Sequence, residues 1–281
     1  FNLSPATSLI VGVCMSVSAS AIALDVLEEM GQLKTRLGTF IVGAGSIDDI
    51  LEVFLITGIL AFLETTVKKI AIAQLLGGVI LFALLTLIFR FWFIPLLIKR
   101  IEHQPEHAQL FTGALIITLL MAVLADFLGV GALIGALFSG IIIRQILLVE
   151  PGHKPWERAE ITHTIHTIAF GFLVPFFFFN VGIHTNPTEL LDYLPFSIVI
   201  TALAIAGTVL GSAIGYYIAY HNWKEGLIVG WALNAKGDTE LVVATLALSA
   251  GAISSAIFSS LIFMAIVSTL ISPLVLRRIR F

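Results

Sequence analysis

Charged residues and cysteines are scarce in this chain of 281 residues. Only 12% of the residues are Asp, Glu, Lys or Arg, and Cys14 is the single cysteine. One cysteine excludes a disulfide framework and a cysteine-rich metal site. Hydrophobic residues dominate instead, at 58% of the chain, and the mean hydropathy is +1.05. Such a composition predicts an integral membrane protein.

Motifs of several functional classes are also missing from the sequence. We find no glycine-rich phosphate-binding loop, no nucleophile-elbow motif and no basic face suited to nucleic acid. Period-2 alternation is absent, and apolar runs of about 20 residues exceed the roughly 10 residues of a barrel strand. The sequence therefore predicts a helical protein that is not an enzyme, carries no cofactor and binds no nucleic acid.

Apolar segments long enough to cross about 30 Å of hydrocarbon recur along the whole chain. This criterion predicts about nine of them, over residues 5–32, 37–63, 70–98, 109–127, 130–148, 161–183, 194–220, 226–250 and 254–276. Short polar connectors separate them, so we expect one all-α polytopic transmembrane domain over residues 1–281. Because the chain opens with Phe1 and enters an apolar segment at once, we also expect an N-terminal part to be missing.

Basic residues are unevenly distributed over the connectors. If the chain starts outside, most of them lie on the inner side: Lys34, Arg36, Lys99, Arg100, Arg144, Lys154, Arg158, Lys224, Arg277, Arg278 and Arg280. Only Lys68 and Lys69 then lie in outer connectors. Since cytoplasmic loops are enriched in Lys and Arg, we expect a multi-pass membrane protein with a cytoplasmic C-terminus. The membrane we expect is that of a prokaryotic cell, an expectation that the charge bias does not itself supply.

Two of the apolar segments are poor continuous helices. Residues 16–21 (Ser-Val-Ser-Ala-Ser-Ala) interrupt the first, and residues 234–240 (Asn-Ala-Lys-Gly-Asp-Thr-Glu) interrupt the eighth. Hydroxyl groups, glycine and charges at membrane depth favour local unwinding around a polar cavity, and transporters place such broken helices at an ion site. Close helix packing remains an alternative for the serines, as does a paired structural charge cluster for Lys236, Asp238 and Glu240.

Asp48 and Asp49 lie near the middle of segment 37–63. A carboxylate at the bilayer centre costs at least about 2.5 to 3.5 kcal/mol by insertion scales, and intramembrane acids usually mark ion or proton pathways. Desolvation and a like-charged neighbour both raise the pKa of a carboxylate, so such an acid can exchange protons near neutral pH. It can then hold either a proton or a hard monovalent cation, with further oxygen ligands from Ser18 and from freed carbonyls. We therefore take the pair as the working site.

Several segments occur in the order seen in one family of transporters. They are residues 26–33 (Val-Leu-Glu-Glu-Met-Gly-Gln-Leu), 43–50 (Gly-Ala-Gly-Ser-Ile-Asp-Asp-Ile), 131–140 (Gly-Ala-Leu-Ile-Gly-Ala-Leu-Phe-Ser-Gly), 175–183 (Pro-Phe-Phe-Phe-Phe-Asn-Val-Gly-Ile) and 233–241 (Leu-Asn-Ala-Lys-Gly-Asp-Thr-Glu-Leu). In these segments the chain resembles the monovalent cation:proton antiporter-2 family of sodium/proton and potassium/proton exchangers. The resemblance covers essentially the whole chain.

The resemblance implies an antiporter fold with an inverted-repeat core and two broken, crossing helices. Residues 1–63 would end the first core repeat, residues 68–183 would form intervening helices, and residues 194–281 would form the second core repeat. Family members have further helices before this point. They are homodimers in the lipid bilayer, with a core domain that moves past an interface domain like an elevator.

By position, the resemblance implies that Asp49 is the essential carboxylate that binds the transported cation and the proton. Asp48 matches the preceding position, which is acidic in electrogenic exchangers. Ser18 stands where the family has Thr or Ser in the first broken helix. In the second broken helix, Lys236 replaces the usual Arg of an Asn-Ala-Arg-Gly motif, and Glu240 matches the glutamate of that motif.

Other polar residues depart from the family pattern or lack a family counterpart. Thr208 stands where sodium exchangers with an aspartate pair often carry Lys, which leaves stoichiometry and electrogenicity open. Glu52 lies one turn beyond Asp48 and can join the site or simply face the cavity. Asp238 matches no required position, and Asn234, which begins the motif of the second broken helix, is a further candidate.

The sequence thus predicts exchange of Na+ or K+ for H+, with cation and proton competing for Asp49. A Kef-type potassium efflux exchanger is an alternative of the same class, and a sodium-coupled organic-anion symporter of related fold is a second. From another class, an intramembrane metalloenzyme would need ligands around His163 and His166, which lie one turn apart. The choice among Na+, K+ and Li+ stays open.

Overall fold

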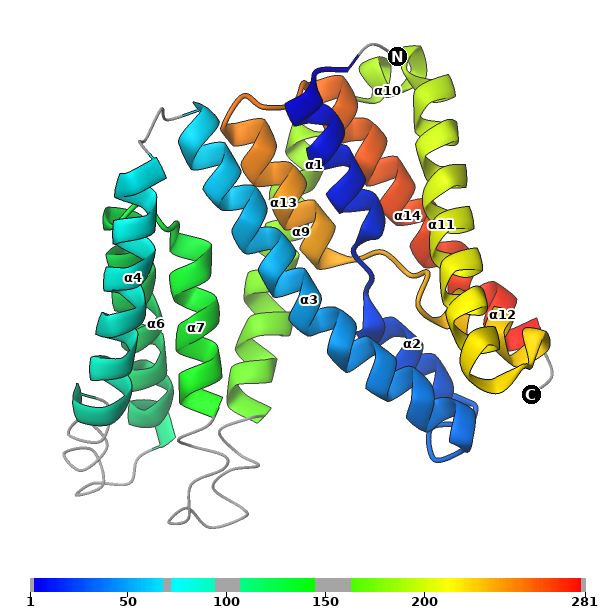
Figure 1. Cartoon of the computed structure of the whole chain (residues 1–281), viewed down its shortest axis with the longest axis horizontal. Helices are drawn as coiled ribbons and strands as arrows, with labels where there is room; N and C mark the ends of the chain where they lie inside the picture. Colours follow the sequence, from blue (N-terminus) through cyan, green and yellow to red (C-terminus); the bar gives the residue numbers. More distant parts are fainter. Residues whose placement is uncertain (1–2, 68–71, 94–106, 145–162, 279–281) are drawn as a thin grey trace. The chain divides into compact units, whose positions relative to one another are not determined.

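A computed structural model describes the chain except for residues 1–2, 68–71, 94–106, 145–162 and 279–281. The described residues are mainly helical, and no β-strand occurs among them (Figure 1). The all-α class predicted from the sequence is therefore confirmed.

Most of the described helices occur where the apolar segments predicted them, and a short helix over residues 187–192 lies in a predicted connector. They are α1 (Pro5–Ser16), α2 (Ser20–Glu29), α3 (Arg36–Val67), α4 (Ile72–Ile88), η1 (Phe89–Phe93), α6 (His107–Phe127), α7 (Ala132–Arg144), η3 (Ala169–Leu173), α9 (Val174–His184), α10 (Pro187–Asp192), α11 (Leu194–Tyr220), α12 (Trp223–Ala232), α13 (Asp238–Ser249) and α14 (Ser255–Arg278). In the described ranges, three helices are long and apolar enough to cross a membrane singly: His163–His184, α11 and α14. Other apolar helices, such as α1, are shorter.

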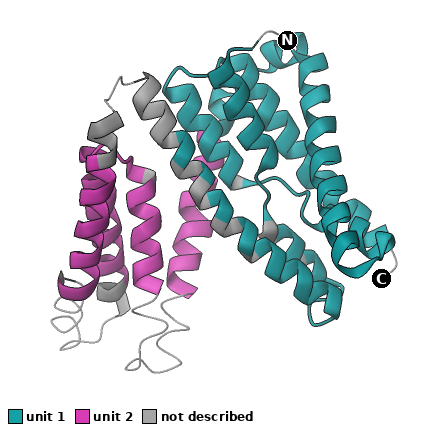
Figure 2. Cartoon of the chain, viewed as in Figure 1, with its two compact units in different colours: residues 1–59, 181–281 teal, residues 60–180 magenta. Residues whose placement is uncertain are grey.

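The chain divides into two compact units, which comprise residues 1–59 with 181–281 and residues 60–180 (Figure 2). This division reflects which residues contact one another, and it does not test whether the two halves of the core are related as repeats. The predicted assignment of the chain to two core repeats and intervening helices therefore stays a prediction.

In the second unit, α6 and α7 pack closely against each other. A Cβ atom added to Gly135 would lie 2.1 Å from the main-chain oxygen of Met121, so only glycine allows this approach. The hydroxyl oxygens of Thr118 and Ser139 are 2.8 Å apart across the same pair of helices. Small residues and paired hydroxyls are the usual means of close helix contact in a membrane.

In the first unit, α11 and α12 form an antiparallel hairpin. His221 turns the chain between them with a φ of 54°, and the Asn222 side chain caps α12 by accepting the N–H of Glu225 at 3.2 Å. A Cβ atom on Gly230 would lie 2.4 Å from the main-chain oxygen of Val209, so glycine sets the spacing of the hairpin. α14 packs against both helices of the hairpin and against α2, α10 and α13.

Both segments predicted to be broken helices are broken in the structure. The first linker (residues 17–19) separates α1 from α2, and Val17 is extended with φ −65° and ψ 142°. The second linker (residues 233–237) separates α12 from α13. The two linkers cross (Figure 1), and the N–H of Ala19 donates to the main-chain oxygen of Ala235 at 2.7 Å. This one hydrogen bond thus satisfies an N–H group of the first linker and a carbonyl group of the second, both of which lie outside the helices.

Candidate ion-binding site

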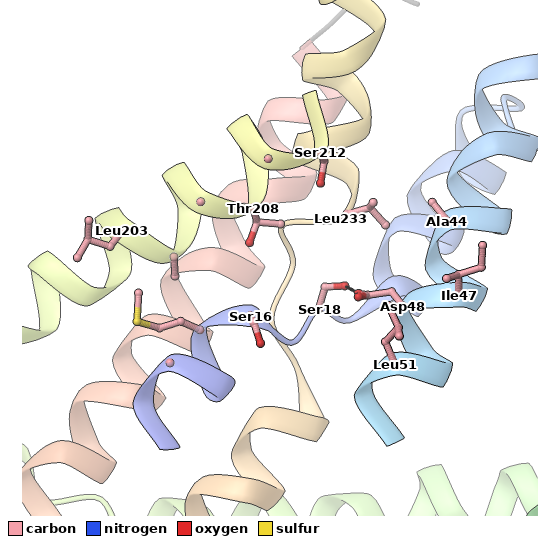
Figure 3. A pocket seen from close by; sticks show the side chains of 15 residues that line it. Ser16, Ser18, Ala44, Ile47, Asp48, Leu51, Leu203, Thr208, Ser212 and Leu233 are labelled. Carbon is pink, nitrogen blue, oxygen red and sulfur yellow. Dashed lines mark hydrogen bonds between the residues drawn. The ribbon is translucent and has the colours of Figure 1, made fainter. Parts of the chain in front are cut away.

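A cavity of about 640 Å³ lies beside the first linker, inside the first unit. α1, α3 and α11 supply most of its wall, and the second linker contributes Leu233 (Figure 3). The polar residues of the wall are Ser16, Ser18, Asp48, Thr208 and Ser212. Glycines and aliphatic side chains form the rest, so the cavity is largely apolar and carries a small polar set, as binding sites for small solutes do.

α3 presents two carboxylates to the first linker. Asp48 and Glu52 are four residues apart and therefore share one face of the helix. The hydroxyl of Ser18 donates to Oδ2 of Asp48, as Figure 3 shows, and the N–H of Ser18 donates to Oε1 of Glu52 at 2.7 Å. Ser18 is 4% exposed and Glu52 is 6% exposed. Two acids of the same helix thus hold both donors of Ser18.

The ammonium of Lys236 lies at the C-terminal end of α1. Its Nζ atom donates to the main-chain oxygens of Met15 at 2.7 Å and Val17 at 2.6 Å, and to the hydroxyl of Thr208 at 3.4 Å. Carbonyl groups in the last turn of a helix lack intrahelical donors and carry partial negative charge. Because Lys236 has no exposed surface, water screens this attraction little.

The second linker and the start of α13 carry further predicted residues. Asn234 is fully buried, and its Nδ2 atom donates to the hydroxyl of Ser272 at 2.9 Å. The hydroxyl of Thr269 donates to the main-chain oxygen of Lys236. Both contacts fasten the second linker to α14. Glu240 on α13 is 1% exposed and lies close enough to attract the ammonium of Lys236 when it is ionised.

The structure places most of the predicted site residues around the crossing of the two linkers. They are Ser18, Asp48, Glu52, Thr208, Asn234, Lys236 and Glu240. Asp49 belongs to α3 and Asp238 begins α13, but their side chains lie outside the described residues. The functional roles of all these residues stay predictions.

The sequence reasoning missed two parts of this site. The oxygens of Met15 and Val17 are main-chain groups beneath apolar side chains, so residue type contains no signal for them. The wall formed by α11 includes Gly207 and Gly211. Small residues four apart on a membrane helix indicate a face reserved for close approach, and this spacing could have identified α11 as part of the site.

A second polar cluster joins α3 to the α11–α12 hairpin. Arg36 and Glu225 form an ion pair with an N–O distance of 2.7 Å, and the hydroxyl of Tyr216 donates to the same oxygen of Glu225. Phe40 packs edge-on against Tyr216, with ring centroids 4.9 Å apart. The Tyr216 hydrogen bond outweighs the effect of burial and, together with Arg36, holds the pKa of Glu225 below its ordinary value. The cluster fastens one end of α3, while Asp48 faces the cavity further along it.

The metal site considered around His163 and His166 gains no support from the described residues. Both histidines are exposed, and the ring of His166 stacks on Phe170 with centroids 4.5 Å apart. In the part of the chain that the structure describes, no three His, Cys, Asp or Glu residues gather closely enough to hold a metal ion.

Comparisons with known proteins match nearly the whole chain. The family described as sodium/hydrogen exchanger, transmembrane, matches residues 1–280. A Na(+)/H(+) antiporter of Enterococcus hirae is 25% identical over 278 residues, which are 99% of this chain and 70% of the relative. The Na(+)/H(+)-K(+) antiporter GerN of Bacillus cereus is 25% identical over 276 residues, 98% of this chain and 68% of the relative. The Na(+)/H(+) antiporter NhaS4 of a Synechocystis strain is 30% identical over 275 residues, 96% of this chain and 65% of the relative.

Proposed function

The chain belongs to the transmembrane sodium/hydrogen exchanger family, and from this premise we propose that it exchanges a monovalent cation for protons across a membrane. The relatives named above are Na+/H+ or Na+/H+-K+ antiporters, and the chain spans about two thirds of their length. The observation that carries the proposal is the hydrogen bond from Ser18 to Asp48 at the wall of the cavity, where two helices are unwound and cross.

Cation binding at this site requires oxygen ligands, which hard cations prefer. In the proposed bound state the cation takes the place of the Ser18 hydroxyl proton as the partner of Asp48. The hydroxyl proton of Ser18 rotates away from Asp48, so that a lone pair of the Ser18 oxygen faces the cation. Asp49, the next residue on α3, is the carboxylate for which cation and proton compete. Because the two acids are adjacent, their protonation belongs to the pair.

Cation and proton transport are coupled because ionised carboxylates with nothing bound are unfavourable inside the membrane. If Asp48 and Asp49 were both ionised with no cation or proton bound, they would carry more negative charge at membrane depth than the single ammonium of Lys236 balances, which is energetically unfavourable. The core therefore moves between the two faces of the membrane only when the site carries one or the other. Exchange results because a proton and a cation cannot occupy the same carboxylate oxygens together.

Lys236 supplies the positive charge of the proposed site. Position 208, where related exchangers often carry Lys, is Thr in this chain and accepts a hydrogen bond from Lys236 at 3.4 Å. Asp48, Glu52 and Glu240 are close enough to attract the buried ammonium when they are ionised. In the proposed site, Lys236 on the second linker thus carries the positive charge that related exchangers often place at position 208 on α11.

The cation is Na+ or K+ in this proposal, since the relatives include antiporters named for each. The bias of Lys and Arg toward one set of connectors supports a cytoplasmic C-terminus. We further propose a homodimer in the lipid bilayer of a prokaryotic cell, which rests on the family resemblance alone.

Collapse of an imposed pH gradient in proteoliposomes of the full-length protein tests the exchange. Na+, K+ and choline are added separately to the parent, to Asp49→Asn and Asp48→Asn variants, and to a control, Glu28→Gln, which changes an exposed acid of α2. We expect Na+ or K+ but not choline to collapse the gradient of the parent and of the control. The Asp49→Asn variant should be inactive, and the Asp48→Asn variant should bind the cation more weakly.

Two outcomes contradict the proposal. One is a parent protein that responds to no cation, and the other is an Asp49→Asn variant as active as the parent. If the parent instead accumulates an organic anion when a sodium gradient is imposed, the protein is a symporter of the alternative type.

A further inference from the structure

Glu52 is a buried acid that binds neither the cation nor the proton in the exchange cycle proposed above. It lies one turn beyond Asp48 on α3 and is 6% exposed. A carboxyl group in such a place is unfavourable unless hydrogen-bond donors satisfy it. One of its donors is the N–H of Ser18, at 2.7 Å from Oε1. Glu52 therefore contacts the same linker residue whose hydroxyl contacts Asp48.

We propose that Glu52 is a positioning residue of the ion site and that it acts through Ser18. This inference rests on the proposed function, because the task it assigns is to hold an oxygen ligand for the transported cation. The N–H of Ser18 is free to make this contact because α1 has ended at the preceding residues. Glu52 accepts this donor and fixes the main chain of the first linker to α3.

The two contacts of Ser18 then have separate tasks. The main-chain contact to Glu52 holds the residue in place through the cycle. The hydroxyl alone changes its partner, because it donates to Asp48 when no cation is bound and turns its oxygen to the cation when one is bound. The first linker has a further anchor in the bond from Ala19 to Ala235. Loss of the Glu52 contact therefore displaces Ser18 without releasing the whole crossing.

The positioning task requires a hydrogen-bond acceptor at residue 52, but it does not require this acceptor to be charged. Glutamine retains an acceptor oxygen of the same reach, whereas leucine has a similar volume and no acceptor. Glu52→Gln and Glu52→Leu are therefore a matched pair that separates the hydrogen bond from the bulk of the side chain.

Hydrogen–deuterium exchange of the full-length protein tests the contact without reference to transport. We expect the Ser18 amide to be protected in the parent and in Glu52→Gln, and to exchange faster in Glu52→Leu. Amides of α14, such as that of Ala265, serve as the internal reference, because α14 contains neither residue of the contact. Equal protection of Ser18 in all three proteins overturns the proposed contact.

Transport assays test the consequence for the ion. We expect Glu52→Leu to raise the apparent KM for the cation about tenfold, which corresponds to about 1.4 kcal/mol, with a smaller effect on the maximal rate. Glu52→Gln should keep the KM of the parent. In a Ser18→Ala background, Glu52→Leu should raise the KM no further, because the ligand that it positions is already missing.

The failures of the two proposals are distinguishable. An inactive parent removes the exchange function, while hydrogen exchange at Ser18 still decides whether Glu52 holds the linker. An active parent with an unchanged KM in Glu52→Leu overturns the positioning role alone. A Glu52→Gln variant whose KM rises as far as that of Glu52→Leu shows that the charge at residue 52 is needed and the acceptor alone is not enough, which also overturns the positioning role.

Discussion

The ammonium of Lys236 donates to the main-chain oxygen of Val17 at 2.6 Å, across 219 residues of sequence. Each of the two groups lies where a helix has ended. The carbonyl lacks a helical donor, and the ammonium is buried away from solvent, so each satisfies the other. Hydrogen bonds from a charged donor are about twice as strong as neutral ones. This contact therefore holds the crossing of the two linkers together.

Replacement of Lys236 by methionine should destabilise the protein and abolish exchange. The change leaves the oxygens of Met15 and Val17 buried without their donor, and an unsatisfied buried acceptor costs about 1 to 3 kcal/mol. Thermal unfolding of purified protein in detergent measures the loss. Lys224→Met, at an exposed residue of α12, is the control and should unfold like the parent. An unchanged unfolding temperature for Lys236→Met would mean that the ammonium does not hold the crossing.

Alanine at position 237 should push the two linkers apart. A Cβ atom there would lie 2.8 Å from the Cβ of Ala19, which is too close for two carbon atoms. We expect a loss of about 1 to 3 kcal/mol, as for other overpacked positions, measured as a lower unfolding temperature. Combining Gly237→Ala with Ala19→Gly should restore part of the stability, because the second change removes the clashing atom.

The control for this substitution is Gly215→Ala on α11. A Cβ atom at that position meets no atom within 4 Å, and alanine is favoured over glycine in a helix by about 0.8 to 1.0 kcal/mol. The control should therefore be neutral or stabilising. Equal losses in the two variants would show that the clash with Ala19 is not the cause.

Protonation of Glu225 should account for part of any loss of stability in acid. This residue lies outside the expected membrane segments, and its hydrogen bond from Tyr216 and its ion pair with Arg36 hold its pKa below the ordinary value of 4.5. A lowered pKa in the folded state means that the contribution is complete above the unfolded pKa. It disappears as the pH falls through the folded pKa.

We therefore expect Glu225→Gln to flatten the decline of the unfolding temperature below about pH 4.5. The effect should be at most about 1 kcal/mol, because Arg36 is largely exposed and such pairs are weak. The exposed Glu28→Gln variant should keep the decline of the parent. If the unfolding temperature of Glu225→Gln falls with pH as steeply as that of the parent, the Arg36–Glu225 pair is excluded as a source of the pH dependence.

The positions of the helices and of their breaks could be predicted from residue pattern alone. Lipid offers no hydrogen-bond partner to the main chain, so long apolar runs have to be helical. α11 begins and ends at the predicted residues. The serines of the first linker and the Asn-Ala-Lys-Gly run of the second are poorly suited to a continuous membrane helix, and the structure is unwound at both.

The candidate site could be predicted only in part. Asp48, Ser18 and Lys236 could be predicted as site residues because charge and hydroxyl groups are costly at membrane depth. Their partners could not be predicted in the same way. Lys236 meets main-chain oxygens, which every residue has, so the identities of residues 15 and 17 carry no information about the contact.

The sequence by itself therefore determined the helical membrane architecture, its two interruptions and the acids that mark the candidate site. Only the tertiary structure decided which groups meet at the crossing. The task of Glu52 depends on how α3 is rotated about its axis against the first linker, and a helix that is apolar on nearly every side carries no sequence signal for that rotation. Packing of the surrounding helices sets the rotation, and with it the hydrogen bonds that Ser18 makes to Asp48 and Glu52.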